Sequence, residues 1–199
     1  MEWKETDRPS PFYWLGTSMF DLIIQTENLV VRTFRLSDAP RVRELAGKYE
    51  IAHMVGSIPH PYPSGMAEQW IGRHDERRRE GKGYPFAIVH QGQLIGSVGL
   101  ETDGGQYLEL GYWLGTEYWR RGYMSEAAKA VLQFAFGWLS KPGIQARVIV
   151  DNAGSKRILE KLGFLFTGHQ ETVFHNVRQR DVEIVHYVLT RDAWTAHRI

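Results

Sequence analysis

Two neighbouring stretches decide the fold of this chain: ELGYWL at residues 109–114 and WRRGYMSEA at residues 119–127. The first is apolar and aromatic, which is typical of a strand. The second passes through Gly122 into apolar residues at helical spacing, which predicts a helix start. A glycine loop before a helix start offers unpaired backbone N–H groups and the positive end of the helix dipole. Such a place suits an anion, most naturally a pyrophosphate, although for this fragment taken alone an ordinary helix start with solvated arginines is the better explanation.

The remaining sequence alternates between strand and helix patterns. Strands are expected at 29–34, 85–90, 93–100, 107–114, 144–150, 164–171 and 182–189, and helices at about 38–49, 64–80, 123–139 and 153–162. A loop rich in proline and glycine, residues 54–65, is the longest in the chain and is a candidate for function. The order β-α-α-β-β-β-α-β-α-β-β predicts an α+β fold, with a mixed, mostly antiparallel seven-stranded sheet flanked by helices.

Composition limits the organisation and the class of partner. The chain has 199 residues, 24 Lys and Arg, 23 Asp and Glu, and no Cys. This length predicts one domain, which we place at residues 19–199, with residues 1–18 as an N-terminal arm or extension. The balanced charge argues against nucleic acid as a partner. Without cysteine there is no disulfide, no thiolate metal site and no cysteine nucleophile.

Three further expectations concern location and ligands. The longest apolar stretch, residues 130–139, is far shorter than the roughly 20 residues that span a bilayer, so no membrane helix is expected. The N-terminus lacks the apolar core of a signal peptide, which favours a cytoplasmic protein. The eight histidines show no metal-ligand spacing, and we expect no metal; His53 and His60 are better explained as residues of the loop or of a substrate pocket.

A second motif, NAGSKRILEKLGF at residues 152–164, begins with a residue that is suited to cap a helix. Taken singly, Asn152 is explained as a helix cap and Ser155 as a polar residue of the first turn. Together with ELGYWL and WRRGYMSEA, however, the motif resembles the GNAT N-acetyltransferase superfamily, in particular its RimJ/RimL-type branch. The resemblance extends from about residue 29 to residue 189.

This resemblance implies acetyl-CoA as the co-substrate. In the family, the loop at 119–124 matches a signature that binds the pyrophosphate through backbone N–H groups. This chain departs from the signature with Trp119 at its first position and Met124 at its last, where Gly or Ala is usual. The end of the preceding strand would pair with the pantetheine, whose arm Asn152 would hold. The implied cofactor-binding residues are Trp113, Leu114, Gly115, Trp119, Arg120, Arg121, Gly122, Tyr123, Met124, Ser125, Asn152 and Ser155.

The resemblance also implies catalytic roles. An amine attacks a thioester only as the free base, so a proton acceptor is needed, and Glu109 is the matching residue. Strand alternation places Glu109 on one face with Tyr107, Gly111 and Trp113, where aromatic neighbours could raise its pKa; the alternative is an ordinary strand glutamate paired with an arginine. A backbone N–H near Leu114 would stabilise the oxyanion, and Ser155 would assist the departing thiolate.

The predicted activity is therefore transfer of acetyl from acetyl-CoA to a primary amine in a ternary complex. The branch suggests a protein N-terminal α-amino group of the ribosomal-protein type as acceptor, with a small amine such as a polyamine or an aminoglycoside as the alternative. A non-catalytic acyl-CoA-binding module is a further alternative. The turn at 174–181 carries Asn176-Val177 where many relatives have Asn-Gly, which bears on acceptor choice. A homodimer through the aromatic N-terminal arm is one further hypothesis.

Overall fold

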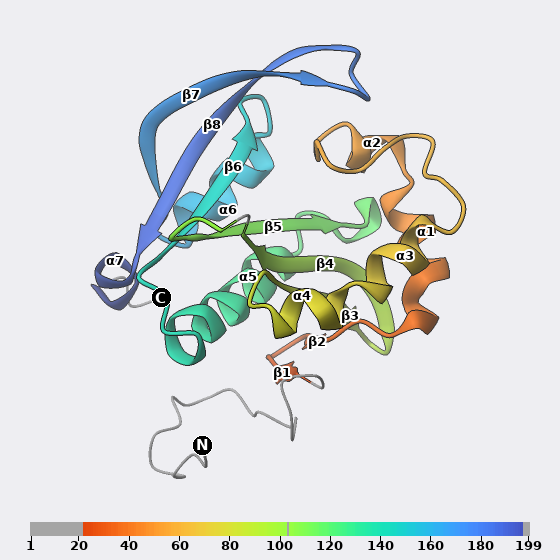
Figure 1. Cartoon of the computed structure of the whole chain (residues 1–199), viewed down its shortest axis with the longest axis horizontal. Coiled ribbons are helices and arrows are strands. Elements are labelled where there is room, and N and C mark those ends of the chain that lie inside the picture. Colours follow the sequence, from red (N-terminus) through yellow and green to blue (C-terminus); the bar gives the residue numbers. More distant parts are fainter. Residues whose placement is uncertain (1–21, 103, 197–199) are drawn as a thin grey trace.

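The computed structural model describes residues 22–102 and 104–196, and these form a single eight-stranded sheet with helices on both faces (Figure 1). The strands are β1 (Ile23–Gln25), β2 (Val30–Arg32), β3 (Gly83–His90), β4 (Gln93–Glu101), β5 (Leu108–Leu114), β6 (Gly143–Ile149), β7 (Leu165–His175) and β8 (Arg180–Thr190). Their order in the sheet is β1-β2-β3-β4-β5-β6-β8-β7. The expected α+β class and mixed sheet are confirmed.

The helices also follow the predicted order. They are α1 (Ala39–Ala46), α2 (Tyr49–Ala52), α3 (Met66–Gly72), α4 (His74–Arg79), α5 (Tyr123–Gln133), α6 (Ala153–Lys161) and α7 (Arg191–Ala196). Short 3₁₀ helices lie at η2 (Leu36–Asp38) and η3 (Thr116–Tyr118), and a π-helical segment, η4 (Phe134–Trp138), follows α5. The proline-rich loop has no regular structure between α2 and α3, as expected.

Several details differ from the expectation, including the helix expected at 38–49, which is interrupted at Gly47 and Lys48 between α1 and α2. The sheet has eight strands instead of seven, because the short β1 forms a hairpin with β2 before the first predicted strand. The helix expected at 64–80 is two helices, since it breaks at Arg73 directly after Gly72, a poor helix former. Its cap is Gly65 in the left-handed conformation, not Ser64. The short helix α7 was not predicted. The arm expected at residues 1–18 lies outside the described residues.

All but one of the strand pairings are antiparallel in the described sheet. The exception is β5 with β6, which are parallel and paired only at Leu108–Ile144 and Glu109–Gln145. Beyond these two pairs β6 turns away from β5, and Figure 1 shows the two strands diverging. β6 instead pairs over its whole length with β8. The sheet is thus two continuous halves joined over a short contact.

Two apolar layers hold the helices to the sheet. One packs α5 and α6 on one face and contains Leu110, Val131 and Leu159, each at most 3% exposed. The other packs α1 and α3 on the opposite face of the first half, with Val42, Ile71 and Trp113. Burial of this kind contributes roughly 25 cal/mol per Å² of apolar surface. The second half of the sheet has helices on one face only, so the other face of β6, β8 and β7 is left open.

None of the described helices is both long enough and apolar enough to cross a membrane.

Candidate active site

The opening between β5 and β6 is the centre of the candidate site. Its closed end is the paired segment at Leu108 and Glu109, and its open end lies beside Leu114 and Ile149. Side chains alternate along β5, so Leu110, Tyr112 and Leu114 face α5 and α6, while Glu109, Gly111 and Trp113 face α1 and the open side. The strand therefore presents different chemistry to the two sides of the sheet.

The backbone of β5 presents free hydrogen-bonding groups to the same opening. The Gly115 N–H donates to the Ile95 carbonyl at 2.9 Å, so Gly115, Trp113 and every second residue before them bond to β4. Tyr112 and Leu114 then direct their backbone groups away from β4, toward the opening. The Leu114 carbonyl accepts a hydrogen bond from the indole of Trp119 at 2.7 Å. The Leu114 N–H is left as a donor at the point where the predicted oxyanion would lie.

The loop before α5 has the geometry expected of an anion site. Arg120 and Gly122 both have positive φ, 60° and 83°, and Gly122 is the cap residue of α5 with no side chain to bond the first N–H groups. Open space surrounds Gly122, since an added Cβ would meet nothing within 4 Å. Helix N–H groups and the dipole end thus face an accessible surface.

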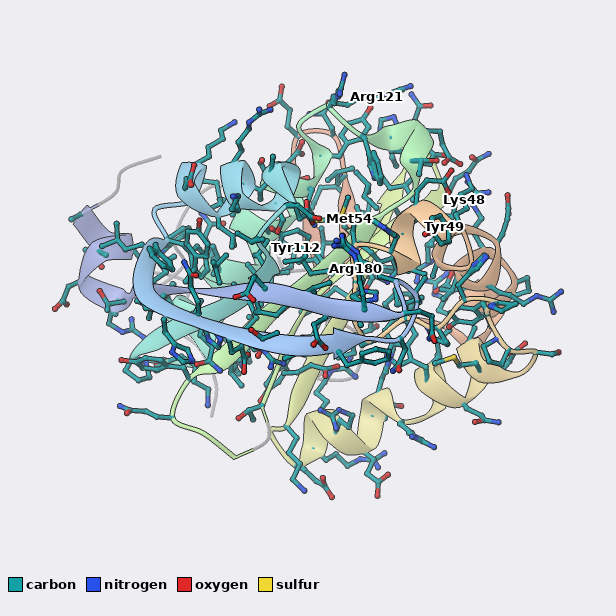
Figure 2. The ribbon with its side chains drawn as sticks, turned by 90° about the horizontal axis from the view of Figure 1, so that it is seen from above. Lys48, Tyr49, Met54, Tyr112, Arg121 and Arg180 are labelled. Atoms are coloured by element: carbon teal, nitrogen blue, oxygen red, sulfur yellow. The ribbon has the colours of Figure 1, made fainter. Side chains whose placement is uncertain are left out.

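The side chains of this loop divide between core and solvent. Met124 is 5% exposed and belongs to the core under α5, so its departure from the family signature does not place a side chain over the N–H groups. Tyr123 packs on the same core and bonds His90 at 3.1 Å. Arg120 and Arg121 are exposed, and Figure 2 shows Arg121 extending from the surface. Ser125 lies half-buried in the first turn of α5.

Asn152 and Ser155 open α6 on the other side of the gap. The Asn152 side-chain oxygen accepts the Ser155 N–H at 3.0 Å, so it caps the helix, the local role that its sequence position suggested. The Ser155 hydroxyl lies 2.8 Å from the Tyr112 hydroxyl, which reaches it from β5. Burial raises the pKa of Tyr112 to about 12 against the opposing effect of this hydrogen bond. Tyr112 was not predicted as a site residue, although its alternation with Glu109 places it toward α6.

On the face of the sheet opposite to Tyr112 and Ser155, Glu109 pairs with an arginine of β6. Arg147 Nε lies 3.1 and 3.0 Å from the two carboxylate oxygens, and the Glu109 side chain is 30% exposed. The structure thus shows the arginine pairing that was one of the two interpretations of this residue. Arg147 also approaches Glu171 at 3.7 Å, and Glu171 bonds His186 at 3.0 Å. A line of charged groups therefore crosses the open face from β5 to β7.

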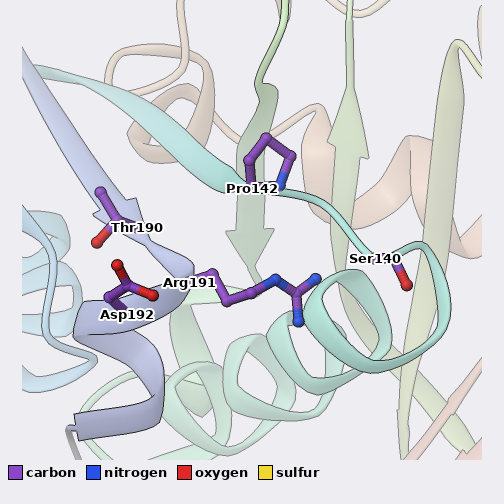
Figure 3. Close-up of a pocket in the computed structure, with 5 residues that line it drawn as sticks. All are labelled: Ser140, Pro142, Thr190, Arg191 and Asp192. Atoms are coloured by element: carbon purple, nitrogen blue, oxygen red, sulfur yellow. The ribbon is translucent and has the colours of Figure 1, made fainter.

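Two hollows lie at opposite ends of β6, and neither is the predicted cofactor site. One of about 300 Å³ is lined by Ser140, Pro142, Thr190, Arg191 and Asp192 (Figure 3). It lies where Gly143 pairs with Thr190, away from the open end of the gap. Arg191 bonds the Lys141 carbonyl there at 2.9 Å, which ties α7 to the loop before β6.

Among the described residues no three His, Asp or Glu side chains are grouped to hold a metal.

Comparison with known proteins identifies the family. A model of the acetyltransferase (GNAT) domain matches residues 28–165. The chain belongs to the GNAT family of acetyl-CoA-dependent N-acetyltransferases. It is 35% identical over 177 residues to the probable N-acetyltransferase YjcK of Bacillus subtilis, an alignment that covers 84% of this chain and 95% of that protein.

Two solved structures share this GNAT fold at low sequence identity. One is RimL, a ribosomal L7/L12 α-N-protein acetyltransferase in complex with coenzyme A, with a TM-score of 0.76, 17% identity, and coverage of 86% and 99% of the two chains. The other is the ribosomal-protein-S5-alanine acetyltransferase of Vibrio fischeri, with a TM-score of 0.74, 22% identity, and coverage of 87% and 99%. The resemblance to RimJ/RimL-type proteins inferred from the motifs is confirmed.

Proposed function

We propose that this GNAT enzyme transfers acetyl from acetyl-CoA to a protein N-terminal α-amino group of the ribosomal-protein type. The observation that carries the proposal is the opening between β5 and β6, which has a helix start with accessible N–H groups, a hydroxyl pair and a carboxylate around it. The acceptor class is supported by the names of similar proteins, which include RimL and the S5-alanine enzyme. Cytoplasmic location and dimerisation stay predictions from the sequence.

Acetyl-CoA would bind from the side of α5 and α6. The backbone N–H groups of Gly122, Tyr123 and Met124 would hold the pyrophosphate, with Arg120 and Arg121 adding positive charge. The pantetheine would continue along the edge of β5 at residues 113–115, where Leu114 directs its backbone groups toward the opening. The Asn152 oxygen is already used in capping α6, so its amide nitrogen is the group left to donate to the pantetheine.

The reaction proposed is direct attack of the amine on the thioester carbonyl. Glu109, directly or through a water, accepts the proton that the amine loses as the new C–N bond forms. The Leu114 N–H bonds the oxygen of the tetrahedral intermediate. The intermediate then breaks its C–S bond, and coenzyme A leaves as a thiolate that Ser155 stabilises or protonates. Arg147 orients the Glu109 carboxylate in this scheme.

The acceptor is tested by mass spectrometry. Wild-type enzyme and acetyl-CoA are incubated with peptides of different N-terminal residues, the same peptides with blocked N-termini, and a set of polyamines and aminoglycosides. We expect acetyl on the α-amino group of unblocked peptides only. Acetylation confined to the small amines would replace the proposed acceptor class with that alternative, and coenzyme A bound without release by any acceptor would contradict the proposed transfer.

The role of Glu109 is tested by Glu109→Gln, which keeps the size of the side chain and removes its basicity. We expect kcat to fall about 100-fold or more, because general-base catalysis typically contributes about that factor. The Kd for acetyl-CoA should stay unchanged in calorimetry. Glu101→Gln is the matched control, because Glu101 lies directly opposite Glu109 on β4 but pairs with Arg77. Equal turnover in the two variants would remove Glu109 from the mechanism.

A further inference from the structure

Three segments that are far apart in the sequence meet at the tip of the β7–β8 hairpin. In Figure 1 this hairpin arches above the sheet toward α2, and Figure 2 labels Met54 of the loop and Arg180 of the hairpin in this region. The turn between the strands carries Arg178, whose side chain is only 2% exposed. An almost fully buried arginine at the end of a projecting hairpin requires partners outside the hairpin.

The partners of Arg178 come from two other segments. Its two terminal nitrogens donate to the two carboxylate oxygens of Asp151 at 2.6 and 3.0 Å. Its Nε donates to the His53 carbonyl at 2.8 Å, and one terminal nitrogen contacts the Met54 sulfur at 3.3 Å. Paired, charge-assisted hydrogen bonds of this kind fix geometry as well as adding energy.

Each partner segment borders the proposed active site. Asp151 directly precedes Asn152, the cap of α6, and so lies one turn from Ser155. His53 ends α2, and Met54 begins the proline-rich loop, which packs in the same cluster as Trp113 on the side of the sheet that Glu109 faces. A hollow of about 160 Å³ lies beside the contact and is lined in part by Asp151, Arg178 and Arg180. Arg178 thus joins the loop, the hairpin and the start of α6 above the open face.

The secondary structure of these segments does not depend on Arg178. The hairpin has its own ladder, with paired residues from Glu171–Ile184 to His175–Arg180. The loop is anchored independently, because Val55, Ile58 and Tyr62 pack on the core of α1 and α3. Buried ion pairs are weak sources of stability but can specify one geometry. Arg178 therefore fixes the position of the hairpin tip relative to the proline-rich loop, two segments that fold without it.

We propose that Arg178 is a specificity-determining residue for the acceptor amine. By holding the hairpin tip against the proline-rich loop, it fixes the spacing of the two segments between which the acceptor would approach Glu109 on the open face. A fixed spacing favours an amine at the end of a slender, extended chain over acceptors that are bulky next to the nitrogen. This inference rests on the proposed function, because it places the acceptor on the side of Glu109.

The specificity test uses Arg178→Ala and Asp151→Asn, which release the two ends of the same contact. Peptides that begin with Ala or with Trp serve as slender and bulky acceptors. We expect the ratio of kcat/KM for the Ala peptide to kcat/KM for the Trp peptide to fall about tenfold or more in both variants, mainly through the acceptor KM. The double variant should add little to this change, because the two sites are coupled. In Arg178→Ala the acetyl-CoA Kd should stay within about twofold, since the partners of Arg178 are Asp151, His53 and Met54 and not the proposed cofactor residues.

Arg32→Ala is the matched control. Arg32 pairs with Asp38 through two hydrogen bonds of 2.7 and 2.8 Å, and both side chains are largely buried, but the pair lies between β2 and α1. This variant should lose stability and keep the wild-type acceptor ratio. A wild-type ratio in Arg178→Ala, or the same altered ratio in Arg32→Ala, would overturn the specificity role.

Hydrogen exchange tests the contact without any acceptor. In Arg178→Ala, the amides that border the contact, in residues 53–55 and 176–179, should exchange faster together, whereas Arg32→Ala should leave both segments unchanged. Protection retained in either segment would overturn the proposal, even if the enzyme were found to acetylate a different class of amine. Failure of wild-type enzyme to acetylate any amine would instead count against the proposed function.

Discussion

Tyr112 and Ser155 meet across the opening, where their hydroxyls lie 2.8 Å apart and the Tyr112 hydroxyl also lies 3.4 Å from the Ser155 carbonyl oxygen. Because burial raises the pKa of Tyr112 to about 12, its hydroxyl keeps its proton at neutral pH. It can then donate to Ser155 Oγ, which leaves the serine proton free to point toward the sulfur of the cofactor. Tyr112 would thus act through Ser155 as a positioning residue.

We expect Tyr112→Phe to lower kcat about 3- to 10-fold, the effect of losing one hydrogen bond of roughly 1 kcal/mol. In a Ser155→Ala background the same change should have little further effect. Tyr187→Phe is the control, because the Tyr187 hydroxyl also contacts α6, at 3.5 Å from Glu160. Steady-state kinetics decide the matter, and equal kcat values for the two Phe variants would count against this role.

His74 makes stability depend on pH. It is 4% exposed, packs edge-to-face against Trp70 and Phe34, and neither ring nitrogen has a hydrogen-bond partner among the described residues. Burial, together with Arg78 and Arg77, lowers the pKa of His74 to about 3. Above pH 6.5 the ring is neutral in the folded and the unfolded chain, and it contributes nothing to pH dependence. Below pH 6.5 the unfolded chain binds a proton that the folded chain does not, so acid destabilises the fold.

The free energy of unfolding should therefore fall by about 2 kcal/mol through His74 between pH 7 and pH 5. His53 and His175 add to this loss, since burial lowers the pKa of each in the folded chain. Urea unfolding at the two pH values should show a smaller loss for His74→Phe than for wild type. His60→Gln, at an exposed loop position, should behave like wild type. A wild-type loss in His74→Phe would refute the assignment.

At the scale of single elements, the start of α5 depends on one glycine. A side chain in the left-handed region costs about 1–2 kcal/mol, and at Gly122 no neighbour adds a steric clash. The exposed loop in Gly122→Ala would relax, and acetyl-CoA would have to restore the strained geometry on binding.

We expect the Kd for acetyl-CoA to rise about tenfold in Gly122→Ala, since 1.4 kcal/mol corresponds to that factor. Gly92→Ala is the matched control, because Gly92 has φ 77° and open space in the turn between β3 and β4. It should lose similar stability and bind acetyl-CoA normally in calorimetry. Normal binding by both variants would show that the loop geometry does not limit affinity.

Most helices, strands and turns could be predicted from the sequence, because turn glycines and the spacing of apolar residues specify them over a few neighbouring positions. The turn at Gln91 and Gly92, both with positive φ, follows from a glycine between two apolar strands. The run of apolar residues after Gly122 predicts α5, but not the change to the wider helical turn at Phe134. The strand β1 has three residues and little pattern of its own, and its pairing with β2 supplies the structure.

At the scale of the whole molecule, the two halves of the sheet are joined over only two residue pairs of β5 and β6. The proposed cofactor would bridge them, because its phosphates would lie at α5 and its pantetheine beside α6. Binding would therefore stabilise the entire fold, and not the loop alone.

Acetyl-CoA at 100 times its Kd should stabilise the folded chain by about 2.7 kcal/mol and raise Tm by about 5–10 °C. Differential scanning fluorimetry measures the shift. Acetyl-pantetheine at the same concentration lacks the nucleotide and its phosphates, so it should give a clearly smaller shift. Equal shifts would contradict binding of the phosphates at α5, and no shift with acetyl-CoA would contradict the cofactor itself.

The class of fold and the family could be predicted from the chain, as could a candidate cofactor loop, because strand and helix periodicity, glycine positions and motif spacing are properties of contiguous residues. Which side chains meet depends instead on the tertiary structure. The pairing of Glu109 with Arg147, of Tyr112 with Ser155 and of Arg178 with Asp151 joins residues 27 to 43 positions apart. Such contacts depend on strand order and on the direction in which each side chain leaves its element, which no local pattern specifies.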